Sequence, residues 1–236
     1  MEEQDLNFKK GNPGAVQFGN FINYYQFHPP EKRISMLPKD IWNFQNCDGL
    51  YALDVGCNSG DLTASLYEYL SNLMHGEKVN ILGIDIDPIL IQRASEKNSS
   101  DNVSFKCFDI MTEDKDFVQK ELEVFNREKF DIVFCFSITM WIHLNHGDEG
   151  LKRFLKRVSS ITNMLVIEPQ PWKCYKTAVK RYKLSKNEFP RFKELQFRET
   201  IETDIESIIL LNSDLKKVEE SERTEWGRKL LFFKKS

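Results

Sequence analysis

The chain has 236 residues and a net charge of −3, and 41% of its residues are hydrophobic and 12% aromatic. This length is enough for one full α/β domain and short for two, and the composition can build a hydrophobic core. The charge argues against a protein that coats nucleic acid generally, and no apolar stretch is long enough to span a membrane. Four histidines and five scattered cysteines without C-x-x-C spacing predict neither a metal site nor a disulfide framework.

The beginning of the chain predicts a location and a domain boundary. Residues 1–5 are acidic, where a targeting peptide would be basic or apolar, and unpaired cysteines suit a reducing compartment, so we expect a cytoplasmic protein. Residues 1–17 predict a flexible lead and residues 18–236 a single domain. Within that domain, residues 18–49 carry an aromatic-rich stretch. It is either a lid across a pocket or a helical segment pinned to the sheet by its rings.

A glycine-bearing turn between a strand and a helix comes next. A mostly apolar run ends at Val55, residues 56–60 contain two glycines, and residues 62–73 have helical periodicity. Such a turn leaves free backbone N–H groups at a helix N-terminus and lets a ligand approach closely. A second strand over residues 81–84 ends in Asp85, whose carboxylate can accept hydrogen bonds from both hydroxyls of a ribose. Together these features predict a nucleoside pocket; the alternative is a turn that only packs the helix on the strand.

The turn also indicates which nucleoside binds. It reads Gly56-Cys57-Asn58-Ser59-Gly60, so it lacks the middle glycine of the G-x-G-x-x-G fingerprint that admits a pyrophosphate. Asn58 instead offers a donor and an acceptor, which suit the carboxylate and ammonium of S-adenosylmethionine. We therefore expect this cofactor, with Gly56 and Asn58 beside its amino acid end.

Further strands and helices alternate along the chain. Pro88 suits the first position of a helix. We expect strands at residues 103–108, 130–137 and 164–168, and helices at 115–126 and 148–161. This alternation predicts an α/β fold with a doubly wound, mostly parallel sheet. Residues 215–218 and 228–233 predict two more strands, the last of them antiparallel because only a short turn precedes it.

Ligands of such sheets bind at the carboxyl ends of the strands, so the residues just after each strand are candidates. Asp109 can accept from an adenine amino group while the backbone N–H of Ile110 donates to a ring nitrogen; the alternative for Asp109 is an ordinary helix N-cap. Met140 is expected to pack on the cofactor, or else to belong to the core.

Two polar segments come after the fourth and fifth strands. Residues 137–148 are expected to be a loop, and they hold His143 and His146. After the fifth strand, a stripe of basic residues at helical spacing begins at the pocket; its members are Lys173, Lys176, Lys180 and Lys183. Such a stripe is either a solvated helix face or a track for RNA phosphates.

Taken together, these motifs resemble the Bicoid-interacting family of S-adenosylmethionine-dependent RNA methyltransferases. The stretches that carry the resemblance are 18–21, 27–31, 53–62, 85–88, 137–148, 168–175 and 226–233. The resemblance covers about residues 18–233 and implies the class I, Rossmann-like methyltransferase fold.

The resemblance also implies site residues and a reaction. It implies that the residues holding S-adenosylmethionine are Arg33, Asn58, Asp85, Asp109 with Ile110, and Met140. It further implies methyl transfer to the 5′-monophosphate of small RNAs, with histidine tRNA and microRNA precursors as substrate classes. We accordingly expect a monomer that acts on small RNA in the cytoplasm and has no DNA or membrane partner.

A phosphate acceptor needs no general base, because its second pKa lies near 6 and its oxygen is already anionic at pH 7. The enzyme then has to position that oxygen, and His143, His146 and Lys173 are the candidates for holding the phosphate. Two other functions stay open: a small-molecule O-methyltransferase, and a catalytically silent RNA-binding module of the same fold.

Overall fold

The computed structural model describes residues 16–235 except 43, 45–48, 75–76 and 114–115. Most of the expected flexible lead, residues 1–15, therefore lies outside the described residues. The described strands form one sheet; they are β1 (Leu50–Val55), β2 (Val79–Asp85), β3 (Val103–Cys107), β4 (Phe130–Phe136), β5 (Thr162–Glu168), β6 (Leu215–Glu220) and β7 (Leu231–Lys235). The described helices are α1 (Tyr24–Phe27), α2 (Pro30–Ile34), α3 (Asp61–Leu73), α4 (Pro88–Lys97), α5 (Asp116–Val124), α6 (Thr139–Ser160), α7 (Trp172–Leu184) and α8 (Ile201–Asn212).

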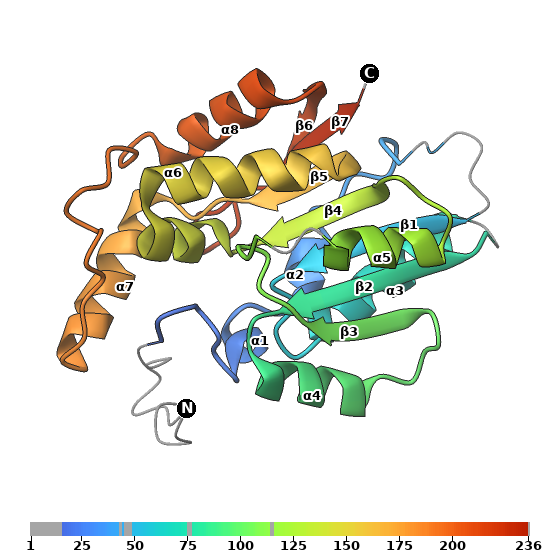
Figure 1. Cartoon of the computed structure of the whole chain (residues 1–236), viewed down its shortest axis with the longest axis horizontal. Helices are drawn as coiled ribbons and strands as arrows, with labels where there is room; N and C mark the ends of the chain where they lie inside the picture. The colour runs from blue at the N-terminus through green and yellow to red at the C-terminus, as the bar shows by residue number, and fades with distance from the viewer. Residues whose placement is uncertain (1–15, 43, 45–48, 75–76, 114–115, 236) are drawn as a thin grey trace.

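The strand order is β3-β2-β1-β4-β5-β7-β6, and β1 to β5 are parallel (Figure 1). The strands β1 and β4 are buried along their whole length, because helices cover both faces of a parallel sheet. Apolar residues of α2 and α3 pack on one face, and those of α5, α6, α7 and α8 pack on the other. The predicted doubly wound α/β fold is confirmed.

The last strand of the described chain lies inside the sheet. β7 pairs antiparallel with β5 on one side and with β6 on the other. This confirms the antiparallel orientation that the short preceding turn predicted. The turn itself, residues 221–230, connects β6 to β7 and is thereby brought to the carboxyl end of β5, where the candidate site lies.

Two helical features differ from the sequence predictions. The segment expected to be a loop over 137–148 is mostly helical, because α6 begins at Thr139 and runs to Ser160. The polar residues of this segment suggested a loop, but Met140 and Leu144 are buried at helical spacing; Gly147 interrupts the helix with φ 70° and ψ −173°. The helix α8 was not predicted at all. No helix among the described residues is both long and apolar enough to cross a membrane.

Candidate active site

The glycine turn after β1 is shaped by its backbone. Gly56 has φ +81°, and a Cβ built on it would lie 2.4 Å from Cγ2 of Ile138, so any side chain at this position would clash. Asn58 also adopts a left-handed conformation, with φ 52°, and its side-chain Oδ1 accepts from the backbone N–H of Ser59 at 2.8 Å. The absence of a side chain at Gly56 thus lets Ile138 pack closely, and both Gly56 and Asn58 line a cavity at the end of the sheet.

The carboxylate of Asp85 ties this turn to the end of β2. One of its oxygens accepts from the backbone N–H of Asn58 and the other from that of Asp87, both at 2.9 Å. Burial raises the pKa of Asp85 to about 6, against the opposing effect of these two hydrogen bonds. Each carboxylate oxygen keeps a second lone pair, so the group can still accept from a bound ligand.

A first cavity opens beside these residues. Its charged and polar lining side chains are Asn20, Tyr24, Tyr25, Asp54, Asn58, Asp85, Asp109, Ser137 and His146. Asp54, at the end of β1, is buried, and burial raises its pKa to about 6 although the hydroxyl of Thr63 donates to it at 2.6 Å. Among the described residues that line it, the first cavity has three carboxylates and neither lysine nor arginine.

The aromatic N-terminal segment closes over the first cavity. The hydroxyl of Tyr25 donates to the carbonyl oxygen of Cys57 at 3.1 Å, and the amide of Asn58 donates to the carbonyl oxygen of Phe21 at 3.0 Å. The amide of Asn20 donates to the carboxylate of Asp87 at 2.7 Å. The segment is partly helical and several of its residues line the cavity. Its action as a lid stays a prediction.

A second cavity adjoins the first, and Tyr24, Ser137 and Trp141 line both. The charge of its lining is opposite to that of the first cavity. Lys173, Arg181 and Arg228 line the second cavity, and none of its described lining residues is acidic. The two cavities therefore meet at three shared side chains and differ in the sign of their charge.

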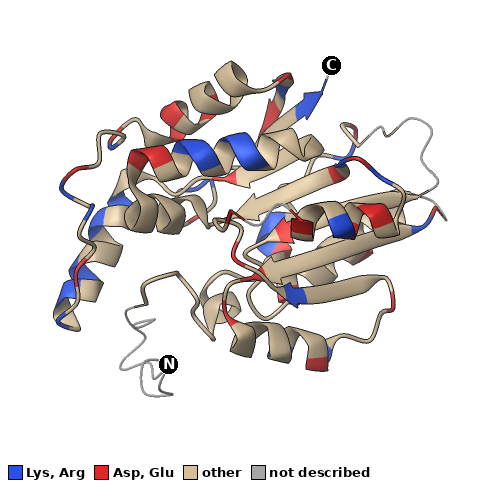
Figure 2. Ribbon diagram, viewed as in Figure 1, with Lys and Arg blue, Asp and Glu red and all other residues tan. Residues whose placement is uncertain are grey.

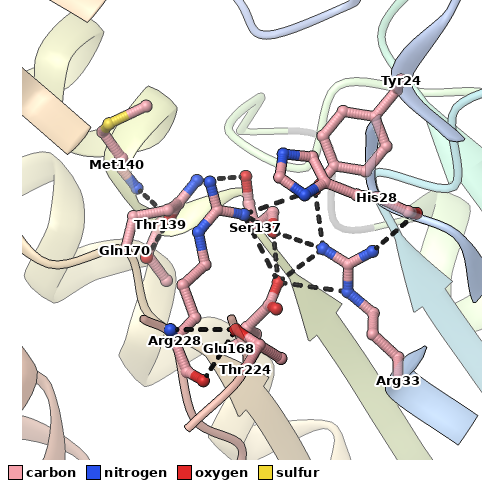
Figure 3. Close-up of polar contacts among 10 residues, drawn as sticks. All are labelled: Tyr24, His28, Arg33, Ser137, Thr139, Met140, Glu168, Gln170, Thr224 and Arg228. Carbon is pink, nitrogen blue, oxygen red and sulfur yellow. Dashed lines mark hydrogen bonds and ion pairs between the residues drawn. The ribbon is translucent and has the colours of Figure 1, made fainter. Parts of the chain in front are cut away.

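A buried polar network surrounds Glu168, the last residue of β5 (Figure 3). The guanidinium of Arg33 donates to Glu168 Oε2 at 2.9 Å, to the hydroxyl of Tyr24 at 2.7 Å and to Ser137 Oγ at 3.0 Å. Arg228 approaches Glu168 from the other side, with 3.8 Å between Nη1 and Oε2, and donates to Ser137 Oγ at 2.5 Å. Burial would raise the pKa of Glu168, but the two arginines outweigh it and lower that pKa.

Matches to known proteins agree with this architecture. A family model described as Bicoid-interacting protein 3 (Bin3) matches residues 130–235, and a methyltransferase domain model matches residues 53–165. A pre-miRNA 5′-monophosphate methyltransferase of Xenopus laevis is 41% identical over 94% of this chain and 94% of that protein. An RNA 5′-monophosphate methyltransferase of Homo sapiens is 40% identical over 94% of this chain and 82% of that protein. The chain belongs to the Bin3 family.

A solved structure supports the fold of this Bin3-family protein. The plantazolicin methyltransferase BpumL, solved in complex with SAH, superposes with a TM-score of 0.55 over 91% of this chain and 88% of that chain, at 13% identity. The chain is an S-adenosylmethionine-dependent methyltransferase with the class I fold. The first cavity fits this cofactor, because its three carboxylates suit a ligand with cationic groups and Asp85, at the end of β2, can accept from ribose hydroxyls.

Most of the residues predicted to bind the cofactor gather around the first cavity. Gly56, Asn58, Asp85, Asp109 and Ile110 all line it. Asp109 also accepts from the backbone N–H of Met111 at 2.8 Å. This hydrogen bond closes a turn, and α5 begins only at Asp116, so Asp109 lines the cavity without capping a described helix.

Two residues that were expected to contact the cofactor do not line the first cavity of this Bin3-family protein. Arg33 is fully buried in the network around Glu168 and lines neither cavity. Met140 lines the second cavity, where its backbone N–H donates to the side chain of Gln170 at 3.0 Å. Direct contact of these two residues with the cofactor stays a prediction.

The three residues expected to hold the phosphate are not brought together. Lys173 lines the second cavity, whereas His146 lines the first. His143 lines neither: its ring is fully buried, Nδ1 lies 3.1 Å from the hydroxyl of Tyr175, and Nε2 lies 2.7 Å from Asp148 Oδ1. Its place in the structure is between α6 and α7.

Sequence analysis missed several polar residues of the site. Tyr24, Arg181 and Arg228 line the second cavity but follow no parallel strand, so the rule of strand ends could not find them. Asp54 did carry a signal, since a carboxylate inside an otherwise apolar strand is rarely without purpose. Arg228 carried none beyond its position shortly before the last strand.

Proposed function

We propose that this Bin3-family methyltransferase transfers the methyl group of S-adenosylmethionine to the 5′-monophosphate of small RNAs. The observation that carries the proposal is the opposite charge of the two cavities, which share Tyr24, Ser137 and Trp141. A cationic cofactor suits the acidic first cavity, and an anionic acceptor suits the basic second one. The names of the relatives, which specify RNA 5′-monophosphate and pre-miRNA, support the same acceptor.

The second cavity is suited to positioning a phosphate. When bound, the cofactor supplies an electrophilic methyl group. A phosphate monoester is mostly dianionic at pH 7, so the chain needs no base and has to hold the attacking oxygen in line with that methyl. Lys173 and Arg181 can hold the phosphate, while the shared side chain of Trp141 can help keep water from the junction. Too strong a hold would stabilise the ground-state charge and slow transfer.

The helix α7 supports a substrate larger than a nucleotide. Lys176, Lys180 and Arg181 line a shallow groove that continues from the second cavity, because Arg181 and Thr177 line both. Figure 2 shows basic residues recurring along this helix. Together with the lysine stripe, this face can contact the backbone phosphates next to the RNA 5′ end.

The proposal extends to substrate class, assembly and location. It takes microRNA precursors and histidine tRNA as substrates of a monomeric enzyme that has no DNA or membrane partner. We also propose a cytoplasmic location. The described cysteines, which are Cys57, Cys107, Cys135 and Cys174, are free thiols. Free thiols are typical of a reducing compartment.

Methylation of matched RNAs tests the proposed function. An RNA ending in a 5′-monophosphate should gain methyl groups when incubated with the enzyme and S-adenosylmethionine, as measured by mass spectrometry. The same RNA ending in a 5′-hydroxyl should gain none, because a neutral hydroxyl needs a base and the described lining of the second cavity has no carboxylate. Methyl groups on the hydroxyl-ended RNA or on an internal base would contradict the proposal. A small-molecule enzyme or a silent RNA-binding module would methylate neither RNA.

A further inference from the structure

The buried network around Glu168 has more positive than negative charge. Two guanidinium groups, those of Arg33 and Arg228, share the one carboxylate of Glu168. Both side chains are buried, with exposed fractions of 0% and 10%. Tyr24 and Ser137, which also accept from these arginines, are neutral partners. A buried cluster with a net charge of one positive is costly unless an anion completes it.

Unused hydrogen-bonding atoms point to the place of that anion. Among the described residues, five buried side-chain polar atoms have no hydrogen-bond partner. Two of them, Arg228 Nε and His28 Nδ1, belong to residues that line the second cavity, whereas Glu168 Oε1, an acceptor of the same network, belongs to a residue that does not line it. Buried polar atoms in native proteins rarely stay unpaired, so such atoms beside a cavity indicate a missing ligand or water. Burial and the two nearby arginines lower the pKa of His28 to about 4, so its ring is neutral at pH 7 and one of its nitrogens can donate.

The position of Arg228 is fixed by the turn between β6 and β7. The backbone N–H of Arg228 donates to the hydroxyl of Thr224 at 3.1 Å, and the backbone N–H of Thr224 donates to the carbonyl oxygen of Arg228 at 2.7 Å. The helix α7 begins at Trp172 with no side-chain cap, and its second residue, Lys173, lines the same cavity. A guanidinium held rigidly beside the positive end of a helix is well placed for an anion.

We propose that Arg228, with His28, forms the anion subsite that binds the terminal phosphate, and that the Nε–H of Arg228 donates to a phosphate oxygen. This inference rests on the proposed function and adds to the phosphate site a residue that does not follow a parallel strand. Arg33 stays the partner of Glu168, whereas Arg228, at 3.8 Å from that carboxylate, is the arginine whose charge remains for the substrate. Methylation removes one negative charge from the phosphate, so the product should be held less tightly than the substrate.

The test compares two dinucleotides that differ only in a 5′-phosphate. Binding of the 5′-phosphorylated dinucleotide and of its unphosphorylated counterpart is measured by calorimetry with the wild type, Arg228→Gln, Arg228→Lys and Lys229→Gln. Lys229 is the neighbouring residue and pairs with Glu220 away from the cavity, so it is the matched control. We expect Arg228→Gln to reduce the preference for the phosphorylated dinucleotide by about tenfold or more, with cofactor binding unchanged.

The other variants separate a contact with phosphate from a structural role. Arg228→Lys keeps the charge but lacks Nε–H, so the preference should fall by about threefold or more. Lys229→Gln should keep it. A residue that only stabilises the turn would weaken binding of both dinucleotides equally, and this outcome overturns the inference. If Arg228→Gln does not fold, as judged by thermal unfolding, an unchanged preference in Arg228→Lys overturns it as well.

Failure of this inference is distinguishable from failure of the proposed function. Dinucleotide binding requires no methyl transfer, so it reports on the subsite alone. A wild type that methylates the phosphorylated RNA while Arg228→Gln keeps the full phosphate preference would overturn only the subsite. A wild type that methylates no phosphorylated RNA would overturn the proposed function.

Discussion

At the scale of single residues, the acids of the first cavity are held in an unusual state. Asp54 and Asp85 both have a pKa raised to about 6 by burial, and both line the cavity. A ligand with cationic groups and ribose hydroxyls interacts best with the ionised carboxylates. Binding should therefore favour their ionisation, which makes cofactor affinity depend on pH.

We expect the affinity for S-adenosylmethionine to fall as the pH drops from about 7.5 to about 5.5. The affinity should fall because the ionised form of Asp85, which binds the cofactor, is lost as the pH falls through its raised pKa of about 6. Asp85→Asn should bind about tenfold more weakly at the higher pH and show a shallower pH dependence, because one of the two carboxylates with a raised pKa is then gone. Calorimetry at the two pH values measures both effects.

The exposed Asp40→Asn is the matched control for this prediction. It should leave both the affinity and its pH dependence unchanged. An Asp85→Asn variant with the wild-type slope would show that Asp85 does not contact the cofactor.

The residues of the site could be predicted from the sequence only where they directly follow a parallel strand. Asn58, Asp85 and Asp109 lie at the ends of successive parallel strands, and the rule that ligands bind at strand ends located all three. Tyr24 and Arg228 come from opposite ends of the chain and meet only through tertiary packing, with 3.4 Å between the hydroxyl and Nη1. No pattern within one segment can indicate such a meeting.

At the scale of elements, His143 connects α6 to α7 and to the segment after α7. Its ring nitrogens lie beside Tyr175 on α7 and Asp148 on α6, and Asp148 also accepts from the backbone N–H of Gln196 at 2.9 Å. Burial lowers the pKa of His143, against the opposing effect of Asp148. One buried side chain thus joins two helices and a loop.

We expect His143→Ala to destabilise the fold by about 2–4 kcal/mol, because it opens a cavity and leaves buried polar groups unpaired. Urea unfolding measures this loss, and the KM for RNA should change little under conditions where the variant is folded. His146→Ala, the comparison variant, should weaken cofactor binding instead. A raised KM for RNA with unchanged stability would restore His143 as a phosphate-binding residue.

The elements themselves were largely predictable, with two instructive exceptions. Buried strands such as β4 are continuous apolar runs, and this pattern placed them within a residue or two. The predicted start of α6 was wrong because polar residues among Met140, Leu144 and Leu151 suggested a loop, although these three are buried at helical spacing. α8 has little contrast between its faces, so periodicity did not reveal it.

At the scale of the whole molecule, a negative net charge coexists with a basic surface on α7. The total is −3, yet α7 presents a series of exposed lysines beside the second cavity. Local charge decides binding of a polyanion, because counterions screen distant charges within about 10 Å at about 0.1 M salt.

We expect a variant with Lys176, Lys180 and Lys183 changed to Gln to bind RNA more weakly and with less dependence on salt. Three lost phosphate contacts should reduce the slope of log affinity against log salt by about 2. Binding titrations at several salt concentrations measure this slope. The control variant removes three lysines from α4, β3 and α5, namely Lys97, Lys106 and Lys120, and should keep the wild-type slope. Equal slopes in both variants would exclude an RNA track on α7.

The N-terminal segment over the two cavities has a consequence for how the enzyme works through successive cycles. It is hydrogen-bonded to Asn58, Cys57 and Asp87 and lines the first cavity, while its Tyr24 also lines the second. We propose that renewal of the spent cofactor requires the segment to lift, and that lifting it also opens the proposed binding place of the RNA end. We expect catalysis to be distributive: each encounter with an RNA delivers one methyl group, and a second would require the RNA to return.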